Sequence, residues 1–119
     1  MKLAIIGSRT ETISLNINSI INYIPINCNC IISGGAEGVD KLAETAAAQL
    51  NIPIKVFLPD YSIYGKNAPL IRNKLIADYC DYLIAFWDFK STGTAHTISY
   101  CIEHSIPFHI FPIDEIKIK

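Results

Sequence analysis

The sequence predicts an α/β fold, a Rossmann-like, doubly wound parallel sheet of five strands with the expected strand order 3-2-1-4-5. Two observations predict it. Short, continuously apolar runs alternate along the chain with longer segments whose apolar residues recur at helical spacing. Continuous apolar runs are typical of parallel strands that are covered on both faces, and right-handed crossovers leave few topologies. The length of 119 residues fits one domain spanning residues 1–119.

Five apolar runs are the predicted strands. In chain order they are Leu3–Ile6, Ile31–Ile32 entered through Cys30, Ile54–Leu58, Tyr82–Trp87 and Phe108–Phe111. Four apolar stripes between them predict helices. The stripes are Ile13, Ile17, Ile20, Ile21 and Ile24; then Val39, Leu42, Ala43, Ala46, Ala47 and Leu50; then Ile71, Leu75 and Tyr79; and last Ala95, Ile98, Cys101 and Ile102. A polar loop is expected from Pro59 to about Asn67, and Pro69 suits the first turn of the helix that follows.

The composition excludes several classes of protein. Ten Lys and Arg against 11 Asp and Glu leave a net charge of -1, which argues against a protein that coats nucleic acid or anionic membrane. No apolar stretch approaches the ~20 residues of a membrane helix, and the N-terminal run is too short for a signal peptide. We therefore expect a cytoplasmic protein. The four cysteines form no Cys-x-x-Cys pair, and we expect no metal and no cofactor.

Three segments that contain glycine and hydroxyl residues follow predicted strands and lead into predicted helices. They are Gly7–Thr10, Ser33–Asp40 and Ser91–Thr94. Helix N-termini offer unpaired N–H groups and partial positive charge, and glycine lets the backbone approach an anion. Each segment alone fits an ordinary turn. Together, on the strands that border the expected crevice at the point where the strand order reverses, they predict an anion-binding crevice.

Charged and aromatic residues near these segments are further candidates. Arg9 and Arg72 are the two arginines of the chain, and a charge-assisted contact to phosphate is expected from each. Asp40 suits either a ribose hydroxyl or the stabilisation of a helix N-terminus, and the sequence does not choose between the two. Trp87 is expected to stack on a ligand ring, whereas His96 suits phosphate contact or proton transfer. Tyr61 and Tyr64 are two more aromatic candidates.

These residues, in this order, resemble the SLOG superfamily of Rossmann-like nucleotide-binding proteins, which includes lysine-decarboxylase-like phosphoribohydrolases and the DNA-processing proteins of natural transformation. The resemblance is carried by Gly7-Ser8-Arg9, Ser33-Gly34-Gly35-Ala36, Gly38-Val39-Asp40, Arg72-Asn73, Ala85-Phe86-Trp87-Asp88, Ser91 and Gly93-Thr94. It implies a nucleotide, nucleotide-sugar or ADP-ribose-like ligand. The expected ligand-binding residues are Gly7, Ser8, Arg9, Ser33, Gly34, Gly35, Gly38, Asp40, Arg72, Asn73, Trp87, Ser91, Gly93 and Thr94.

The resemblance leaves the activity open. Phosphoribohydrolases of this superfamily use an Arg and a Glu; Arg72 matches the Arg, but the position of the Glu is Thr97. Hydrolysis through an oxocarbenium-like transition state needs a carboxylate, for which Asp88 and Glu37 are the candidates. We therefore expect a binding or sensing module. A small hydrolase of nucleoside monophosphates is the alternative, with Arg72 and Asp88 as catalytic candidates, and single-stranded DNA binding ranks lower. A homodimer through helices is expected.

Overall fold

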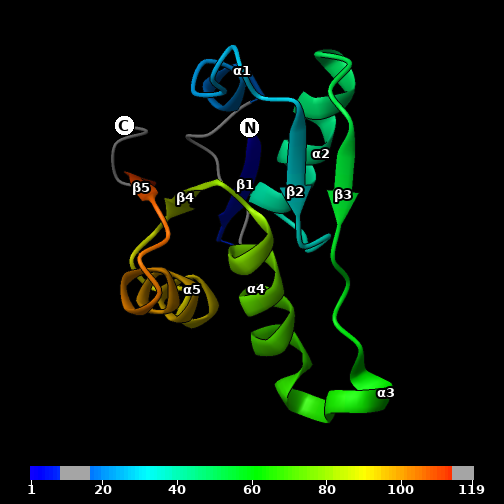
Figure 1. Cartoon of the computed structure of the whole chain (residues 1–119), viewed down its shortest axis with the longest axis vertical. Helices are drawn as coiled ribbons and strands as arrows, with labels where there is room; N and C mark the ends of the chain where they lie inside the picture. The colour runs from blue at the N-terminus through cyan, green and yellow to red at the C-terminus, as the bar shows by residue number, and fades with distance from the viewer. Residues whose placement is uncertain (9–16, 114–119) are drawn as a thin grey trace.

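The chain forms a parallel α/β sheet with its first strand at the centre (Figure 1). The computed structural model describes residues 1–8 and 17–113, so Arg9, Thr10 and Ile13 of the sequence analysis lie outside the described residues. The described part contains β1 (Lys2–Gly7), β2 (Cys30–Ser33), β3 (Ile54–Val56), β4 (Tyr82–Trp87) and β5 (Phe108–Pro112). These five strands are ordered β3-β2-β1-β4-β5 and pair in parallel, which confirms the predicted fold and strand order.

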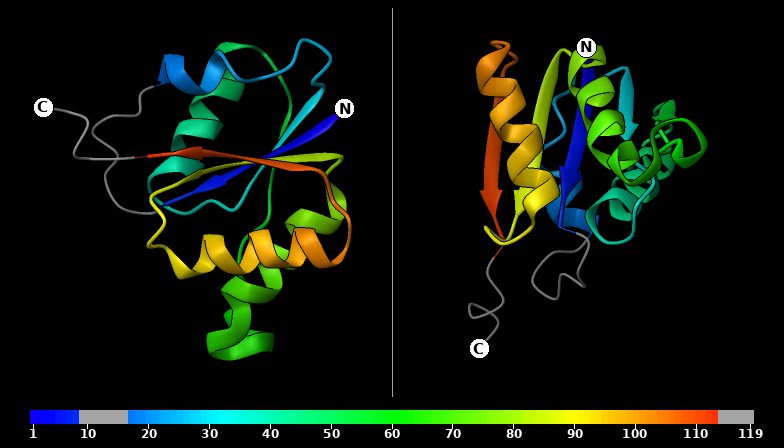
Figure 2. Two further views of the ribbon diagram at one scale, coloured as in Figure 1. Left: turned by 90° about the vertical axis from the view of Figure 1, so that its left-hand side faces the viewer. Right: turned by 90° about the horizontal axis from the view of Figure 1, so that it is seen from below.

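Helices cover both faces of the sheet (Figure 2). One face carries α1 (Ile17–Ile21) and α2 (Val39–Gln49), and the other carries α4 (Ala68–Tyr79) and α5 (Thr92–Glu103). Alternate residues of β1 supply the two cores, because successive side chains of a strand point to opposite faces. Leu3 and Ile5 pack in the α1–α2 core, whereas Ala4 and Ile6 pack in the α4–α5 core. Buried strands of this kind read as the continuous apolar runs seen in the sequence.

The prediction of a loop from Pro59 to about Asn67 is wrong, because this segment forms the short helices α3 (Tyr61–Tyr64) and η1 (Gly65–Asn67). Asp60 is the N-cap of α3, and its carboxylate accepts a hydrogen bond from the backbone N–H of Ile63 at 3.3 Å. Such a cap satisfies an N–H group that has no partner within the helix. The helix predicted from the apolar stripe that ends at Ile24 is shorter in the structure, because α1 ends at Ile21.

The topology of the sheet favours a binding site at the carboxyl ends of its strands. The helices that come next after β1 and β4 along the chain, α1 and α5, lie on opposite faces of the sheet. In open parallel sheets, this reversal of strand order opens a crevice beyond the strand ends. No helix within the described residues is long and apolar enough to cross a membrane.

Candidate functional site

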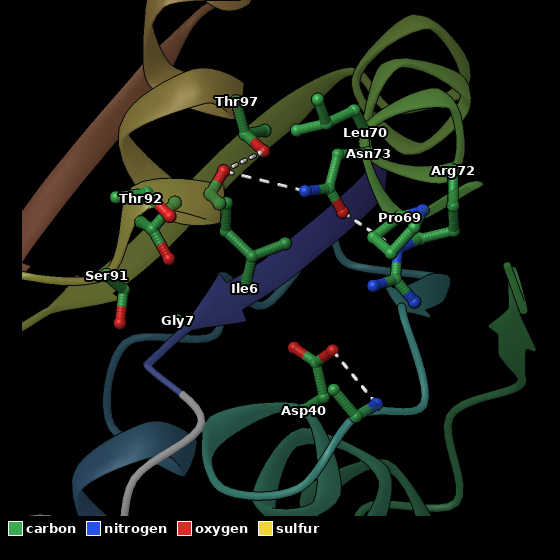
Figure 3. A pocket seen from close by; sticks show the side chains of 13 residues that line it. Ile6, Gly7, Asp40, Pro69, Leu70, Arg72, Asn73, Ser91, Thr92 and Thr97 are labelled. Carbon is green, nitrogen blue, oxygen red and sulfur yellow. Dashed lines mark hydrogen bonds between the residues drawn. The ribbon is translucent and has the colours of Figure 1, made fainter. Parts of the chain in front are cut away.

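A cavity of about 360 Å³ lies at the carboxyl end of β1, between the β2–α2 loop and the first turns of α4 and α5 (Figure 3). Its lining residues are Ile6, Gly7, Ala36, Asp40, Pro69, Leu70, Arg72, Asn73, Ser91, Thr92, Gly93, Thr94 and Thr97. In Figure 3, Ser91 and Thr92 lie on one side of the cavity and Arg72 on the other. The cavity therefore occupies the place that the strand order predicts for chemistry.

The N-terminus of α5 opens into this cavity. Thr92, Gly93 and Thr94 form its first turn, which contains no acidic residue. Among the described residues, the Ser91 side chain at the N-cap makes no capping hydrogen bond. The first N–H groups of a helix have no partner within the helix and carry its partial positive charge. The first turn of α5 thus offers hydrogen-bond donors to an anion in the cavity.

Side chains behind the cavity hold the segment before α5 in place. Oδ1 of Asp88 accepts hydrogen bonds from the backbone N–H groups of Lys90 (2.8 Å) and Ser91 (2.9 Å). The indole Nε1 of Trp87 donates to the Ser91 carbonyl at 3.0 Å. Desolvation raises the pKa of Asp88, but hydrogen bonds from Ser91, Lys90 and Ser8 outweigh it and hold this pKa below its ordinary value. Neither Trp87 nor Asp88 lines the cavity, so the structure places both as supports of the loop.

Hydrogen bonds from Arg72 connect α4 to the two segments that follow β2 and β3. Its Nη1 donates to the carbonyl of Gly34 and, at 3.4 Å, to the carbonyl of Phe57. Its Nε donates to Oδ1 of Asn73 at 2.8 Å. The side chain is only 5% exposed, and it lines the cavity wall. Arg72 therefore fixes the β2–α2 loop from within, in addition to placing a guanidinium beside the cavity.

The β2–α2 loop is filled by the protein itself. A Cβ atom on Gly34 would lie 2.8 Å from Nη1 of Arg72 and 2.8 Å from Oδ2 of Asp40. Gly35 has a φ of 72°, which favours glycine, and a Cβ there would lie 2.8 Å from a methyl group of Leu58. Oδ2 of Asp40 accepts from the backbone N–H of Ala36 at 3.2 Å. The fold therefore requires glycine at both positions, because other groups of the protein lie close to the backbone there.

The N-terminus of α2 is closed, in contrast to that of α5. The backbone N–H of Val39, the first residue of α2, donates to the Ser8 carbonyl at 3.2 Å. Asp40 places a carboxylate in the first turn of the helix and is 7% exposed. A carboxylate there offsets the positive end of the helix dipole. The structure thus places Asp40 in the first turn of α2 and also among the residues that line the cavity, and its binding to a ribose hydroxyl stays a prediction.

Two side chains converge on the Gly93 carbonyl at the start of α5. Oγ1 of Thr97 donates to it at 3.0 Å, and Nδ2 of Asn73 donates to it at 3.5 Å (Figure 3). Asn73 therefore connects Arg72 on one side with the first turn of α5 on the other. Thr97 is 2% exposed and lines the cavity from the position that the family resemblance assigns to a Glu.

The structure brings part of the predicted ligand-binding set to the cavity. The predicted residues that line it are Gly7, Asp40, Arg72, Asn73, Ser91, Gly93 and Thr94. The predicted residues that do not line it are Ser8, Ser33, Gly34, Gly35, Gly38 and Trp87. Arg9 lies outside the described residues. Tyr61 and Tyr64 project on α3, 57% and 43% exposed, and are not among the lining residues.

Three lining residues, Ile6, Pro69 and Leu70, are not among the predicted site residues. Ala36 and Thr92 lie within the predicted segments Ser33–Asp40 and Ser91–Thr94, and Thr97 is the position that the family resemblance assigns to a Glu. Pro69 and Leu70 lie in the first turn of α4, three positions before Arg72 and Asn73 respectively, so helical spacing was the signal that could have found them. Ile6 carries no polar side-chain group, and no sequence signal marks it.

No family model matches the chain, and no curated protein matches it. Among solved structures, the chain is similar to the X-ray structure of DNA processing protein A from Streptococcus pneumoniae, with a TM-score of 0.70 and 20% sequence identity. The similarity covers 93% of this chain and 50% of that chain, so the present sequence spans half the length of its structural neighbour. At this identity, the likeness shows a shared fold, and membership of the SLOG superfamily stays a prediction.

Proposed function

We propose that the cavity binds a phosphate-bearing, nucleotide-derived ligand, and that the chain works as a binding or sensing module. The open N-terminus of α5 carries this proposal. Its first turn lines a cavity at the reversal of strand order, without an acidic residue and without a side-chain cap among the described residues. Helix N-termini in this setting are general phosphate-binding sites. The phosphate would accept hydrogen bonds from the backbone N–H groups of Thr92, Gly93 and Thr94.

The charges of the cavity support a ligand of low charge. Among the described lining residues, Arg72 is the cation and Asp40 the anion. The Arg72 guanidinium already donates hydrogen bonds to the carbonyls of Gly34 and Phe57. Its main contribution to the cavity is therefore positive electrostatic potential. The Asp40 carboxylate suits the hydroxyl groups of a ribose, a role that acidic residues have in dinucleotide-binding folds. A nucleotide with one phosphate at α5 and a ribose toward Asp40 matches both groups.

Two observations rank the alternatives below binding. Hydrolysis of an N-glycosidic bond needs a carboxylate near the ligand. Thr97 stands where that Glu is expected, and Asp88 supports the loop instead of lining the cavity. Single-strand binding uses aromatic platforms and a basic groove. No aromatic residue is among the described residues that line the cavity.

The test is a titration of the four nucleoside 5′-monophosphates and ADP-ribose into the wild type and Gly93→Val, followed by calorimetry. We expect saturable binding to the wild type. Gly93→Val is expected to weaken it by ten-fold or more, because branched bulk would stand over the phosphate donors. A Cβ at Gly93 meets only Nδ2 of Asn73, at 3.8 Å, so the melting temperature should stay close to that of the wild type.

The control for this titration is Lys41→Ala, an exposed lysine on α2 that pairs with Glu44. It should bind as the wild type does. Binding that Gly93→Val leaves unchanged would contradict the proposed place of the phosphate, and no binding of any of these ligands would contradict the proposed function.

Thr97→Glu tests the hydrolase alternative. If only the carboxylate is missing, this variant should release free base from a nucleoside monophosphate while the wild type should not, as followed by chromatography. The new carboxylate would face the cavity that Thr97 lines. Asn73 still donates to the Gly93 carbonyl after the Thr97 hydroxyl is lost. Robust release by the wild type would overturn the binding module and assign a hydrolase.

A further inference from the structure

The two edge strands of the sheet differ in how their side chains are covered. Phe108, Ile110 and Phe111 of β5 pack against the cores that the sheet forms with its helices. Ile54 and Val56 of β3 are 40% and 38% exposed and belong to neither core of the described residues. Within the part of the chain that the structure describes, no strand pairs with the outer side of β3. The described sheet therefore ends at β3 in an apolar edge that is open to another strand.

The main chain of β3 turns alternate residues toward β2 and away from it. The Pro53 carbonyl accepts a hydrogen bond from a backbone N–H of β2, and the N–H of Phe57 donates to a carbonyl of β2, each at 2.9 Å. The N–H and C=O groups of alternate residues in a strand point to the same side. Since Pro53 and Phe57 face β2, Ile54, Val56 and Leu58 direct their main-chain groups outward.

A band of large apolar side chains follows this edge. Val56 and Leu58 lie on one face of the sheet, because a Cβ built on Gly35 would meet methyl groups of the two at 3.0 and 2.8 Å. The chain then leads to α3, which lies beyond the end of β3 (Figure 1). The exposed apolar residues of this edge band are Ile54, Val56, Leu58, Tyr61, Ile63 and Tyr64. Together they offer on the order of 500 Å² of apolar surface, a size that marks interaction sites.

Lys55, the charged residue of β3, does not protect this edge. Lysines on edge strands commonly prevent pairing with other chains. The Nζ of Lys55, however, lies 5.4 Å from the centroid of the Phe57 ring and 5.2 Å from that of the Tyr79 ring on α4. The ammonium is thus held over the face of the sheet that α4 covers. Successive side chains of a strand point to opposite faces, so this charge lies away from the face that carries Val56.

The edge matches itself in one antiparallel register. A register centred on Val56 places this residue opposite its own copy, Ile54 opposite Leu58, and Lys55 opposite Phe57. The first two pairs are apolar, and the third joins an ammonium to an aromatic ring. The three residues with outward main-chain groups then all pair with the second copy. A register centred on Lys55 would instead place two lysines opposite each other, which is destabilising, and would centre on main-chain groups that face β2.

We propose that a second copy of this chain pairs with this edge, β3 against β3 in antiparallel orientation about a two-fold axis at Val56, so that the two five-stranded sheets become continuous. The same surface is used on both copies, as a two-fold axis requires. The antiparallel register brings α3 of each copy toward residues 50–53 of the other, where Leu50 is 39% exposed.

The size of the edge band fits this partner. With the main chain of β3 and the segments beside it, the band approaches the ~800 Å² that each partner buries in a standard interface. The proposed contact differs from the dimer through helices that the sequence analysis expects, because an edge strand lies at its centre. It also goes beyond the proposed function, since Val56 is not among the residues that line the cavity.

The experiment measures the mass of the protein in solution by sedimentation at micromolar concentrations. We expect the wild type to be a dimer. Val56→Lys and Val56→Glu should each halve this mass, because two like charges would face each other across the axis. An equimolar mixture of the two variants should form a dimer again, since a lysine then faces a glutamate. Restoration in the mixture also shows that both variants are folded.

The control is Ile102→Lys, which places the same charge on an apolar residue of α5 that is 64% exposed. It should remain a dimer. A monomeric wild type would overturn the proposal and leave the edge to a strand of another protein. A dimer that Val56→Lys leaves intact, or that the mixed variants do not restore, would also overturn it. Dissociation by Ile102→Lys alone would assign the dimer to the helices. In each case the nucleotide titration decides the proposed function separately.

Discussion

The loops that precede α2 and α5 look alike in the sequence and differ in the structure. Each follows a strand that neighbours β1 and leads into a helix of 11 or 12 residues, and serine and glycine lie in the loop or in the first turn of that helix. The loop before α2 is filled by the Arg72 guanidinium and the Asp40 carboxylate. At Gly93, in the first turn of α5, an added Cβ would make only an ordinary contact, with Nδ2 of Asn73 at 3.8 Å. A glycine in such a loop therefore signals that something approaches the backbone, and the fold decides whether that group belongs to the protein or to a ligand.

The difference extends to the electrostatics of the two helix ends. Val39 at the start of α2 donates to the Ser8 carbonyl, and Asp40 adds a negative charge to the same turn. The first turn of α5 has neither an acidic residue nor a side-chain cap among the described residues. Because the helix dipole acts mainly within the first turn, the two helices present different potentials at the same edge of the sheet. The start of α2 is compensated within the protein, and the start of α5 is where we propose that an anion binds.

The largest expected effect comes from Arg72→Ala, which would empty the filled loop. The carbonyls of Gly34 and Phe57 would lose a buried donor, and leaving buried polar groups unsatisfied costs about 1–3 kcal/mol each. We expect a loss of about 3 kcal/mol in the free energy of unfolding, measured by urea denaturation. The neighbouring, exposed Lys74→Ala should stay within about 0.5 kcal/mol of the wild type. Equal stability of the two variants would show that Arg72 does not hold this loop.

A paired substitution sharpens the comparison of the two loops. Gly34→Ala places a Cβ 2.8 Å from Nη1 of Arg72, and we expect it to destabilise the protein by about 1–3 kcal/mol, as overpacking does. Gly93→Ala should change the free energy of unfolding by less than about 0.5 kcal/mol, as open positions do. Thermal denaturation of the two variants side by side measures the contrast. Equal losses would break the distinction between a filled and an open loop.

The smallest expected effect concerns the support of the open loop. The pKa of Asp88 is lower in the folded protein than its ordinary value, so the ionised carboxylate stabilises the fold. This contribution is complete above the pKa of about 3.9 that Asp has in an unfolded chain, and it is lost as the pH falls through the folded pKa. We therefore expect Asp88→Ala to be less stable than the wild type at pH 7.

The same comparison at acid pH tests the cause. The stability difference between Asp88→Ala and the wild type should shrink below about pH 4, measured by urea denaturation at several pH values. Glu37→Ala, which removes an exposed carboxylate from the filled loop, provides the control. A difference that stays constant down to pH 2 would mean that Asp88 acts through packing and not through its charge.

Local patterns predicted the fold but not the use of each loop. Continuous apolar strands and helical stripes depend on neighbouring residues, so the sheet and its order followed from the sequence. The filling of the β2–α2 loop depends on Arg72, which comes 38 positions after Gly34. The sequence placed both arginines near the expected crevice, but it had no means to show that Arg72 donates to a carbonyl. Short-range patterns could not separate Gly34 from Gly93, because the deciding contacts are long-range.

The missed helix α3 teaches a smaller lesson of the same kind. Its start signal was present in Asp60, whose carboxylate caps Ile63, but the short segment carries no apolar stripe. All its residues are exposed or capped locally, so packing gives no period to read. Thr97 shows the converse case. Its identity departs from the family pattern, yet only the structure shows that its hydroxyl donates a hydrogen bond to the Gly93 carbonyl.

The central position of β1 has a kinetic consequence. Leu3 pairs with Ile31 on one side and with Tyr82 on the other, so neither partner is available from a hairpin. Parallel pairs of this kind close long stretches of chain before they gain contacts, which slows folding. Until β4 forms, one edge of β1 has unpaired N–H and C=O groups along a strongly apolar strand, and such edges invite pairing with other chains. The strand that organises the finished sheet is therefore also the segment most exposed to misassembly while the protein folds.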